Sequence, residues 1–428
     1  MINKNNLPPS WAIVTFEDLL DYIQPTEFIV ASTDYDDNYK TPVLTAGKSF
    51  IKGYTNETNE IFDAVPVIIF DDFTTATQFV NFPFKVKSSA MKILKPTCDL
   101  VNIKLAFYFM QTVHLKSETH KRYWISEYSK LSIPLPPHKE QQRIFEKLEE
   151  LFTNLDKGIE SLKAAQQQLK VYRQSVLKWA FEGKLTNENA ELLAGWKDVK
   201  IKDVADCLDN LRKPINKTER QKRHGNIPYY GANGRTGWID DYLFDEPLIL
   251  VVEDETFVGR ELPFSYKISG KTWVNNHAHI LKVKAETNID FLNYQLSYYP
   301  FLPLTTGSTG RKKLTKDKLV NAPVKICSSK KQIKIVHEIE RRLSVCDKIE
   351  EIIETSLLQS EALRLSILKK AFEGKLVKQN PKDEPAQKLL ERIRIEKMNA
   401  APKERNTLTQ GAALRSKKTS KLKSPERT

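Results

Sequence analysis

The sequence predicts an α+β protein in which two mixed α/β domains are joined by two long helices packed as an antiparallel coiled coil, with pseudo-two-fold symmetry. Residues 141–185 recur without a gap as residues 332–376, about 191 positions later. One ungapped duplicate at this distance favours a two-fold molecule over a solenoid, which needs at least three stacked units of shorter period. The segments between the duplicates have the short β-branched runs and Gly- and Asn-rich turns of mixed domains.

A heptad repeat in each duplicate predicts the long helices. Apolar residues step by three and four over residues 145–180 and again over 336–371, and Arg173 and Arg364 occupy the same step of the two seams. About forty residues at about 1.5 Å each give a helix near 60 Å long, which needs a partner for its apolar seam. We therefore expect the two helices to pack on each other, with a coiled coil between two chains as the alternative.

Glycines mark the expected ends of both helices. Gly183 and Gly374 occupy equivalent positions and suit the left-handed residue that closes a helix. The resulting organisation has five parts. These are a first domain at residues 1–137, a first helical spacer at 138–186, a second domain at 187–327, a second helical spacer at 328–380, and a C-terminal segment at 381–428 with a short helix and a basic disordered tail.

The two globular segments also resemble each other. Trp11 with Asp18 corresponds to Trp196 with Asp203 at an offset of about 185. Each segment then has an apolar strand that ends in two acids, at residues 67–72 and 248–254. The whole chain, and not only its helices, therefore follows a doubled plan.

Composition favours a soluble protein with a polyanionic partner. Charged residues make up 28% of the chain, hydrophobic residues 40%, and the formal net charge is +13. Phosphates attract such a surface and release counterions on contact. No apolar run approaches a bilayer span and the start lacks the apolar core of a secretion signal, so we expect a cytoplasmic protein. The four cysteines are widely spaced and are expected to be buried thiols.

Motifs for nucleotide binding are near matches only. Residues 46–49 and 269–272 look like the end of a phosphate-binding loop, but Pro42 and Ser265 replace the glycine that its tight turn requires. Residues 231–237 do not match the dinucleotide fingerprint. We expect no cofactor in this chain.

Other polar residues could suggest a nuclease or a metal site. The acid pairs Asp71-Asp72 and Glu253-Asp254 follow strands, but no lysine follows at catalytic spacing, and their recurrence fits a structural turn or a base-reading acid better. His277 and His279 would lie on one side of a strand without a third ligand, which favours a hydrogen-bonded strand pair or a base-edge contact over a metal.

Polar loops with basic residues are the expected DNA contacts. Small hydroxyl residues and glycine let the backbone approach phosphate, while Arg and Lys add charge or a bidentate contact to guanine. Such clusters precede both helices, and a third at residues 229–235 adds aromatic rings. The candidates are Lys48, Lys116, Ser117, Thr119, His120, Lys121, Arg122, Tyr229, Tyr230, Asn233, Arg235, His277, Ser308, Thr309, Arg311 and Lys312.

The order of these motifs resembles the DNA-specificity subunit of type I restriction-modification systems, over nearly the whole chain to about residue 397. The motifs are Trp11, Pro134-Leu135-Pro136 with Glu140-Gln141-Gln142, Ala180-Phe181-Glu182-Gly183-Lys184-Leu185, Trp196, Ala371-Phe372-Glu373-Gly374-Lys375-Leu376 and Asp383-Glu384-Pro385-Ala386. One departure is that Lys331-Gln332 stands where the first copy has Glu140-Gln141, so docking contacts are expected to differ there.

The resemblance implies that each domain is a target recognition domain reading one half of a bipartite site in double-stranded DNA. The helices would be spacers that fix the gap and dock two methyltransferase (modification) subunits, with Phe181, Lys184, Phe372 and Lys375 at the docking positions. Those partners would carry S-adenosylmethionine and methylate adenine N6, and motor-nuclease (restriction) subunits would add ATP- and Mg-dependent cleavage. This chain itself would be non-catalytic.

Two readings from other classes remain alternatives. The first is an autonomous restriction or methylation enzyme with paired recognition domains, and the second is a coiled-coil scaffold that binds DNA or proteins.

Overall fold

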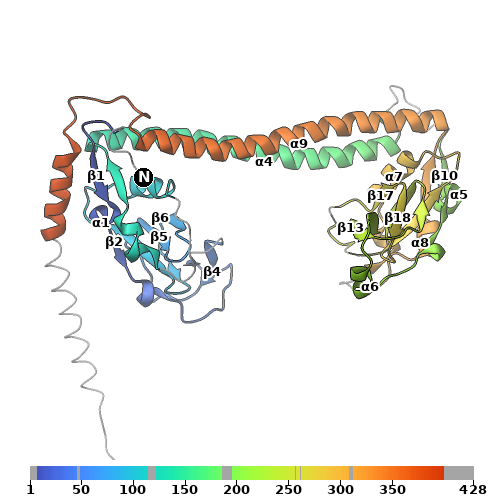
Figure 1. Cartoon of the computed structure of the whole chain (residues 1–428), viewed down its shortest axis with the longest axis horizontal. Helices are drawn as coiled ribbons and strands as arrows, with labels where there is room; N and C mark the ends of the chain where they lie inside the picture. Colours follow the sequence, from blue (N-terminus) through green and yellow to red (C-terminus); the bar gives the residue numbers. More distant parts are fainter. Residues whose placement is uncertain are drawn as a thin grey trace, which may run out of the picture. The chain divides into compact units, whose positions relative to one another are not determined.

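The computed structural model describes residues 7–45, 49–113, 122–185, 195–255, 257–260, 262–307 and 312–399. The chain forms two compact units: Met1–Glu160 with Leu357–Thr428, and Ser161–Ser356. Each unit contains one mixed domain and parts of two long helices, α4 (His138–Phe181) and α9 (Ser329–Phe372) (Figure 1). Within the described residues, no helix is both long and apolar enough to cross a membrane.

The domain of the first unit contains nine short strands and three short helices in its described residues. In chain order they are β1 (Ala12–Thr15), α1 (Phe16–Leu19), β2 (Leu20–Ile23), β3 (Thr41–Leu44), β4 (Ile51–Thr55), β5 (Val67–Asp71), β6 (Thr77–Val80), β7 (Lys85–Val86), β8 (Met91–Pro96), α2 (Ile103–Met110), α3 (Tyr123–Ser126) and β9 (Ser132–Leu135). The sheets have the orders β2-β8-β5-β6, β4-β3-β7 and β1-β9. The central strand β5 is buried along its whole length, as its unbroken apolar run predicts.

The domain of the second unit repeats this plan. Its elements are β10 (Lys197–Lys200), α5 (Ile201–Val204), β11 (Ala205–Cys207), α6 (Lys217–Lys222), β12 (Ile227–Gly231), β13 (Gly234–Ile239), β14 (Phe244–Asp245), β15 (Leu248–Val252), β16 (Asp254–Glu255), β17 (Ser265–Ile268), β18 (Lys271–Val274), β19 (Ala278–Val283), α7 (Ile289–Ser297), β20 (Lys312–Lys313), α8 (Lys316–Val320) and β21 (Pro323–Ile326). The order β11-β19-β15-β17 corresponds to β2-β8-β5-β6, and β10-β21 corresponds to β1-β9. The duplication predicted for the domains is therefore confirmed at the level of strand pairing.

The helices pair antiparallel within each unit. In the first unit Arg364 of α9 forms an ion pair with Asp156 of α4. In the second, Arg173 of α4 lies 2.6 Å from Asp347 and 2.9 Å from Glu350 of α9. The offset of 191 residues converts Asp156 into Asp347 and Arg173 into Arg364, so the two units use the same contact.

The predicted heptad seam is covered within the chain. Every seam position over residues 145–180 and 336–371 is buried or half-buried. Near one end of the pair, Val176 and Ala180 of α4 share an apolar cluster with Val336 and Ile339 of α9. Because half-exposed ion pairs contribute only about 0.2–1 kcal/mol each, the apolar seam supplies most of the pairing energy.

Both helices end as their glycines predict. Gly183 and Gly374 have positive φ values of 75° and 71°. In the first helix, Lys184 N donates to Trp179 O at 2.8 Å and Gly183 N to Ala180 O at 3.3 Å, the pair of bonds that defines a Schellman motif. The same bonds close the second helix.

A C-terminal helical segment, residues 386–399, packs on the first domain. Its apolar residues Ala386, Leu389, Leu390 and Ile393 join the core of that unit. Arg394 lies 3.5 Å from Asp18, and Lys397 lies 3.3 Å from Asp21. The predicted basic tail from residue 400 onward lies outside the described residues.

We predict that Gly374→Ala destabilises the protein by about 1–3 kcal/mol, because alanine must adopt a left-handed conformation. Its Cβ would also meet Pro8 Cγ at 2.4 Å. Gly158→Ala is the matched control, since it lies in the interior of α4 with nothing within 4 Å of the added Cβ, and it should stabilise by up to about 1 kcal/mol. Thermal unfolding of both variants measures the difference, and equal effects would contradict this account.

Candidate nucleic-acid interface

In the first domain, the acid after the central strand ties three loops together. Asp72 N donates to Ala90 O at 3.3 Å, and Asp72 O accepts from Tyr123 N at 3.0 Å. Its carboxylate accepts from Trp124 N at 2.9 Å and lies 3.6 Å from Lys92 Nζ. The strand end is thus joined to the loop before β8 and to the segment that leads into α3.

The second domain repeats this junction with other side chains. Glu253 N donates to His277 O at 3.0 Å, and Glu253 O accepts from Leu314 N at 2.8 Å. The Glu253 carboxylate pairs with Arg212 and lies 3.0 Å from Lys313 Nζ. We call Asp71 and Asp72, with Glu253 and Asp254, the acidic junctions of the two domains.

The acidic junctions are structural. Asp71, Asp72 and Glu253 are buried with their carboxylates bonded inside the domain. Asp254 Oδ1 lies 2.7 Å from Nδ1 of His277. The reading of these acids as structural turns, and not as nuclease ligands, fits this geometry. Each junction lies beside a segment where DNA contacts are predicted, the one that precedes Tyr123 in the first domain and the one that precedes Leu314 in the second.

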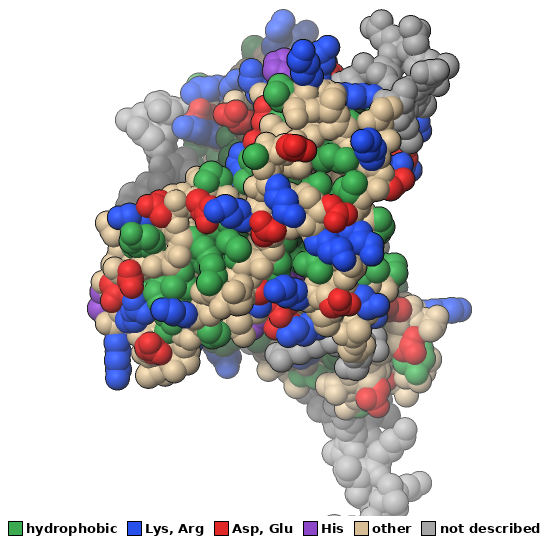
Figure 2. Space-filling model, turned by 90° about the vertical axis from the view of Figure 1, so that its right-hand side faces the viewer, with side chains coloured by type: hydrophobic (Ala, Val, Ile, Leu, Met, Phe, Trp, Pro, Cys, Tyr) green, Lys and Arg blue, Asp and Glu red, His purple; other side chains and the backbone are tan. Residues whose placement is uncertain are grey.

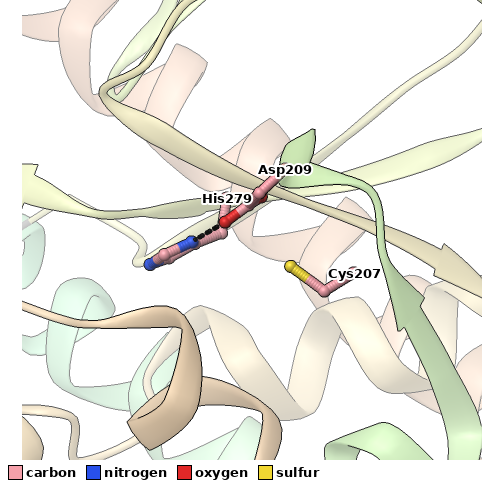
Figure 3. A group of neighbouring side chains, drawn as sticks. All are labelled: Cys207, Asp209 and His279. Carbon is pink, nitrogen blue, oxygen red and sulfur yellow. Dashed lines mark hydrogen bonds and ion pairs between the residues drawn. The ribbon is translucent and has the colours of Figure 1, made fainter. Parts of the chain in front are cut away.

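A buried network lies behind the junction of the second domain (Figure 3). His279 Nδ1 lies 2.6 Å from Asp209 Oδ2, and its Nε2 lies 2.8 Å from Leu314 O. Both ring nitrogens therefore face oxygen acceptors. Cys207 lies nearby, and burial together with the charge of Asp209 raises the pKa of this thiol to about 12. Because both imidazole nitrogens are bonded to oxygen atoms of the chain, His279 anchors the segments of Asp209 and Leu314 to β19.

His277 and His279 have different roles. His279 is fully buried in the network, whereas the His277 ring is exposed beside Asp254. His279 therefore forms hydrogen bonds inside the domain, and the base-edge contact of His277 stays a prediction.

Many predicted contact residues lie outside the described part of the chain. They are Lys48, Lys116, Ser117, Thr119, His120, Lys121, Ser308, Thr309 and Arg311. Two residues that flank these segments do lie beside the junctions, because exposed Arg122 directly precedes Tyr123, and Lys312 pairs with Glu255 in the ladder β16–β20.

The predicted aromatic loop splits into a buried and an exposed part. Tyr229 is only 1% exposed and packs with Ile239 and Trp273, so the contact predicted for its ring is wrong. Alternation along β12 causes this, since successive side chains point to opposite faces. Tyr230 is half-buried, whereas Asn233, on the turn between β12 and β13, and Arg235, in β13, are exposed.

Arginines that were not predicted stack on aromatic rings of the second domain. Arg220 lies 4.8 Å from the Tyr229 ring centroid and Arg223 4.7 Å from that of Trp273. Arg220 also lines a hollow of about 630 Å³ together with Asn216, Asn276 and His277. The basic run at residues 217–223 was the available signal, but its proximity to these rings depends on long-range folding.

The predicted docking residues differ in exposure. Phe372 is 8% exposed and its ring centroid lies 4.7 Å from that of Phe109, so it is a core residue and not a contact surface. Phe181 is half-buried, 5.2 Å from the Phe291 ring, and lines a groove of about 780 Å³ in the second unit. Lys184 and Lys375 are exposed, beside Glu182 and Glu373 respectively.

The departure at residue 331 has a visible consequence. In the first unit Trp11 Nε1 donates to Glu140 Oε2 at 3.0 Å. In the second unit Lys331 replaces that acid and lies 5.6 Å from the Trp196 ring centroid. Trp196 Nε1 is buried without a hydrogen-bond partner among the described residues. The two helix entrances are therefore chemically different.

One face of the molecule is mixed in charge. On the face drawn in Figure 2, Lys and Arg side chains alternate with acidic and apolar ones. This face lacks the continuous basic surface that phosphate binding favours.

Comparison with known proteins identifies the family. This doubled fold has equivalent loop clusters in both of its domains. The type I restriction modification DNA specificity domain matches residues 8–170 and 194–359, once in each half, and the chain belongs to this family.

Two similar proteins are specificity subunits of type I restriction enzymes. The EcoR124I/EcoR124II specificity subunit of Escherichia coli is 50% identical over 125 residues, covering 28% of this chain and 31% of that protein. The E. coli EcoBI specificity subunit is 28% identical over 313 residues, covering 62% and 64%. The matched regions thus span from about a third to just under two thirds of these relatives.

A solved structure shows the same fold. It belongs to work on complex assembly and conformational transition of the type I R-M system, and has a TM-score of 0.63 at 16% identity. The match covers 86% of this chain and 99% of that one.

We predict that the buried network makes the second domain sensitive to acid. Burial opposes ionisation of Glu253, but bonds from Arg212 and Lys313 and the charge of His279 outweigh it and lower its pKa. Burial also opposes ionisation of Asp209, but the hydrogen bond from His279 and the charge of that ring lower its pKa. The pKa of Glu253 is lower in the folded protein than in the unfolded chain, where it is near 4.5. The ionised carboxylate therefore stabilises the folded protein above that pH, and this stability is lost as the pH falls through the folded pKa.

Glu253→Gln should therefore cost about 3–5 kcal/mol at pH 7 and flatten the fall in stability below about pH 4.5. The control is Glu338→Gln on α9, where bonds from Arg341 and Arg342 lower the pKa to about 2 but solvent screens the pair. Its cost should stay under about 1 kcal/mol. Chemical denaturation across pH measures both, and an unchanged acid profile for Glu253→Gln would refute the network's role.

Proposed function

We propose that the protein is the DNA-recognition subunit of a type I restriction-modification complex, reading one half of a bipartite site with each domain. The observation that carries this proposal is the repeated acidic junction, which gathers the same three loops in both domains. Each cluster exposes side chains suited to phosphate or base edges, such as Arg122 in the first domain and His277 in the second.

Family membership supports a role without catalysis by this chain. The relatives above are named specificity subunits, and the matching family is a DNA specificity domain. We infer that adenine methylation, with S-adenosylmethionine, belongs to methyltransferase subunits, and that ATP- and Mg-dependent cleavage belongs to restriction subunits.

The exposed face of the helices supports docking of those partners. Large apolar side chains are exposed on both helices, as a partner-binding surface requires. They are Val171, Tyr172 and Trp179 on α4, and Ile333, Val345, Ile349, Ile352, Leu358, Leu363 and Leu365 on α9. The groove beside Phe181 and the exposed Lys184 and Lys375 would extend this surface, whereas Phe372 would support it from the core.

We further propose that the helix pair sets the gap between the half-sites. Repeating the heptads Ile159–Ala165 in α4 and Glu350–Ser356 in α9 should lengthen the pair by about 10 Å, which corresponds to about 3 base pairs of duplex. The half-sequences should stay unchanged, because neither domain is altered. Single-molecule sequencing of methylated adenines, in cells that supply the partner subunits, measures the gap.

The control repeats the heptad in α4 alone. That variant puts the two seams out of register and should lose site-specific methylation instead of shifting the gap. An unchanged gap in the double insertion would show that the helices do not set the spacing.

A further inference from the structure

The loop between β5 and β6 presents a phenylalanine to solvent on a tightly held turn. Asp71 Oδ1 accepts from Phe73 N at 2.9 Å and from Thr74 N at 3.2 Å. The backbone closes the turn through Asp71 N to Ala76 O at 2.8 Å and Thr75 N to Asp71 O at 3.0 Å. Four bonds to one buried acid fix this loop, so Phe73 is held in place before any partner arrives.

Two features set this loop apart from an ordinary surface turn. The Phe73 side chain is 44% exposed. Thr75 has a φ of 60°, a left-handed conformation that costs a β-branched residue free energy. An apolar ring that is exposed to water on a turn with a strained backbone indicates a contact that forms when a partner binds.

The second domain has the same feature at the equivalent loop. After its acidic junction, Val258 is 52% exposed and Leu262 is 56% exposed. The left-handed residue here is Gly259, with a φ of 68°. The sequences of the two loops are unrelated, yet each combines an exposed apolar side chain with a left-handed turn at the same position in the fold.

The surroundings of both loops are suited to a nucleic-acid backbone. The junction places the Phe73 loop next to Ala90, whose neighbours Lys87, Ser88 and Ser89 are exposed, and next to the segment that follows Arg122. In the second domain the same bonds bring the loop to His277 and to Lys312-Lys313. A protein partner would favour an apolar surround, whereas a single apolar tip among cationic and hydroxyl groups fits a duplex with an opened base step.

We propose that Phe73 in the first domain, and Val258 with Leu262 in the second, are wedges that insert between stacked base pairs at each half-site. The inference rests on the proposed DNA-recognition function and extends it from reading bases to deforming the duplex. An opened step lowers the energy needed to extrude a neighbouring adenine for methylation by a partner. It also makes recognition depend on how easily that step unstacks, even where no base edge is contacted.

The test uses the full chain in its complex with methyltransferase subunits, on duplexes that carry its bipartite site as found by methylation mapping. Placing 2-aminopurine at successive positions of the first half-site reports unstacking as a rise in fluorescence. The wild type should give a rise at one step only, and Phe73→Ala should remove it and weaken specific binding about tenfold or more. Phe73→Trp should keep both, because an indole ring fills the same step.

Tyr22→Ala is the matched control, since Tyr22 has the same 44% exposure as Phe73 but lies on β2, outside the loop. It should leave the fluorescence and the affinity unchanged. A further measurement places a mismatched base pair at the step where the fluorescence rises. Because a mismatch already weakens stacking at that step, it should restore most of the affinity that Phe73→Ala loses.

Other outcomes overturn the proposal in distinguishable ways. A wild-type complex that binds its site specifically without any rise in fluorescence refutes the wedge and leaves the recognition function intact. Loss of methyltransferase assembly in Phe73→Ala, measured by size-exclusion chromatography, would assign the loop to a protein contact instead. Absence of specific binding by the wild type would refute the recognition function itself.

Discussion

The apolar seam between α4 and α9 is the contact on which the rest of the structure depends, because each domain begins or ends on one of its helices. The seam alone does not choose a direction, since both helices offer the same heptads. Arg173, Arg364, Asp156 and Asp347 supply that choice. In a parallel, in-register pair these duplicated residues would face their own copies, arginine against arginine and aspartate against aspartate. Antiparallel pairing converts both repulsions into ion pairs.

A second constraint acts inside each domain. The acidic junctions hold three loops through backbone bonds that recur in both domains, while the side chains around them differ. Lys92 balances Asp72 in the first, and Arg212 with Lys313 balances Glu253 in the second. A scaffold that depends on the backbone leaves the loop sequences free to vary. Two domains of one plan can therefore carry different recognition surfaces.

Local periodicity and duplication made the helices, their glycine ends, the buried central strands and the antiparallel pair predictable. The errors lie where a contact joins distant residues. Tyr229 and Phe372 were predicted to face a partner, but alternation in β12 and packing on Phe109 turn them inward. The stacking of Arg223 on Trp273, and the network of His279, could not be predicted because they join segments tens of residues apart. A pattern shows which side of an element is apolar, but not which loop lies beside it.

Disulfide trapping tests the antiparallel pairing most directly. In a chain whose native cysteines are replaced by serine, Asp156→Cys with Arg364→Cys should form a bond within one chain under mild oxidation, as should Arg173→Cys with Asp347→Cys. Asp156→Cys with Asp347→Cys should not, because these residues meet only in a parallel pair. Mass spectrometry of the oxidised proteins reads the outcome. Efficient linkage of the 156–347 pair, or bonds only between separate chains, would contradict the account.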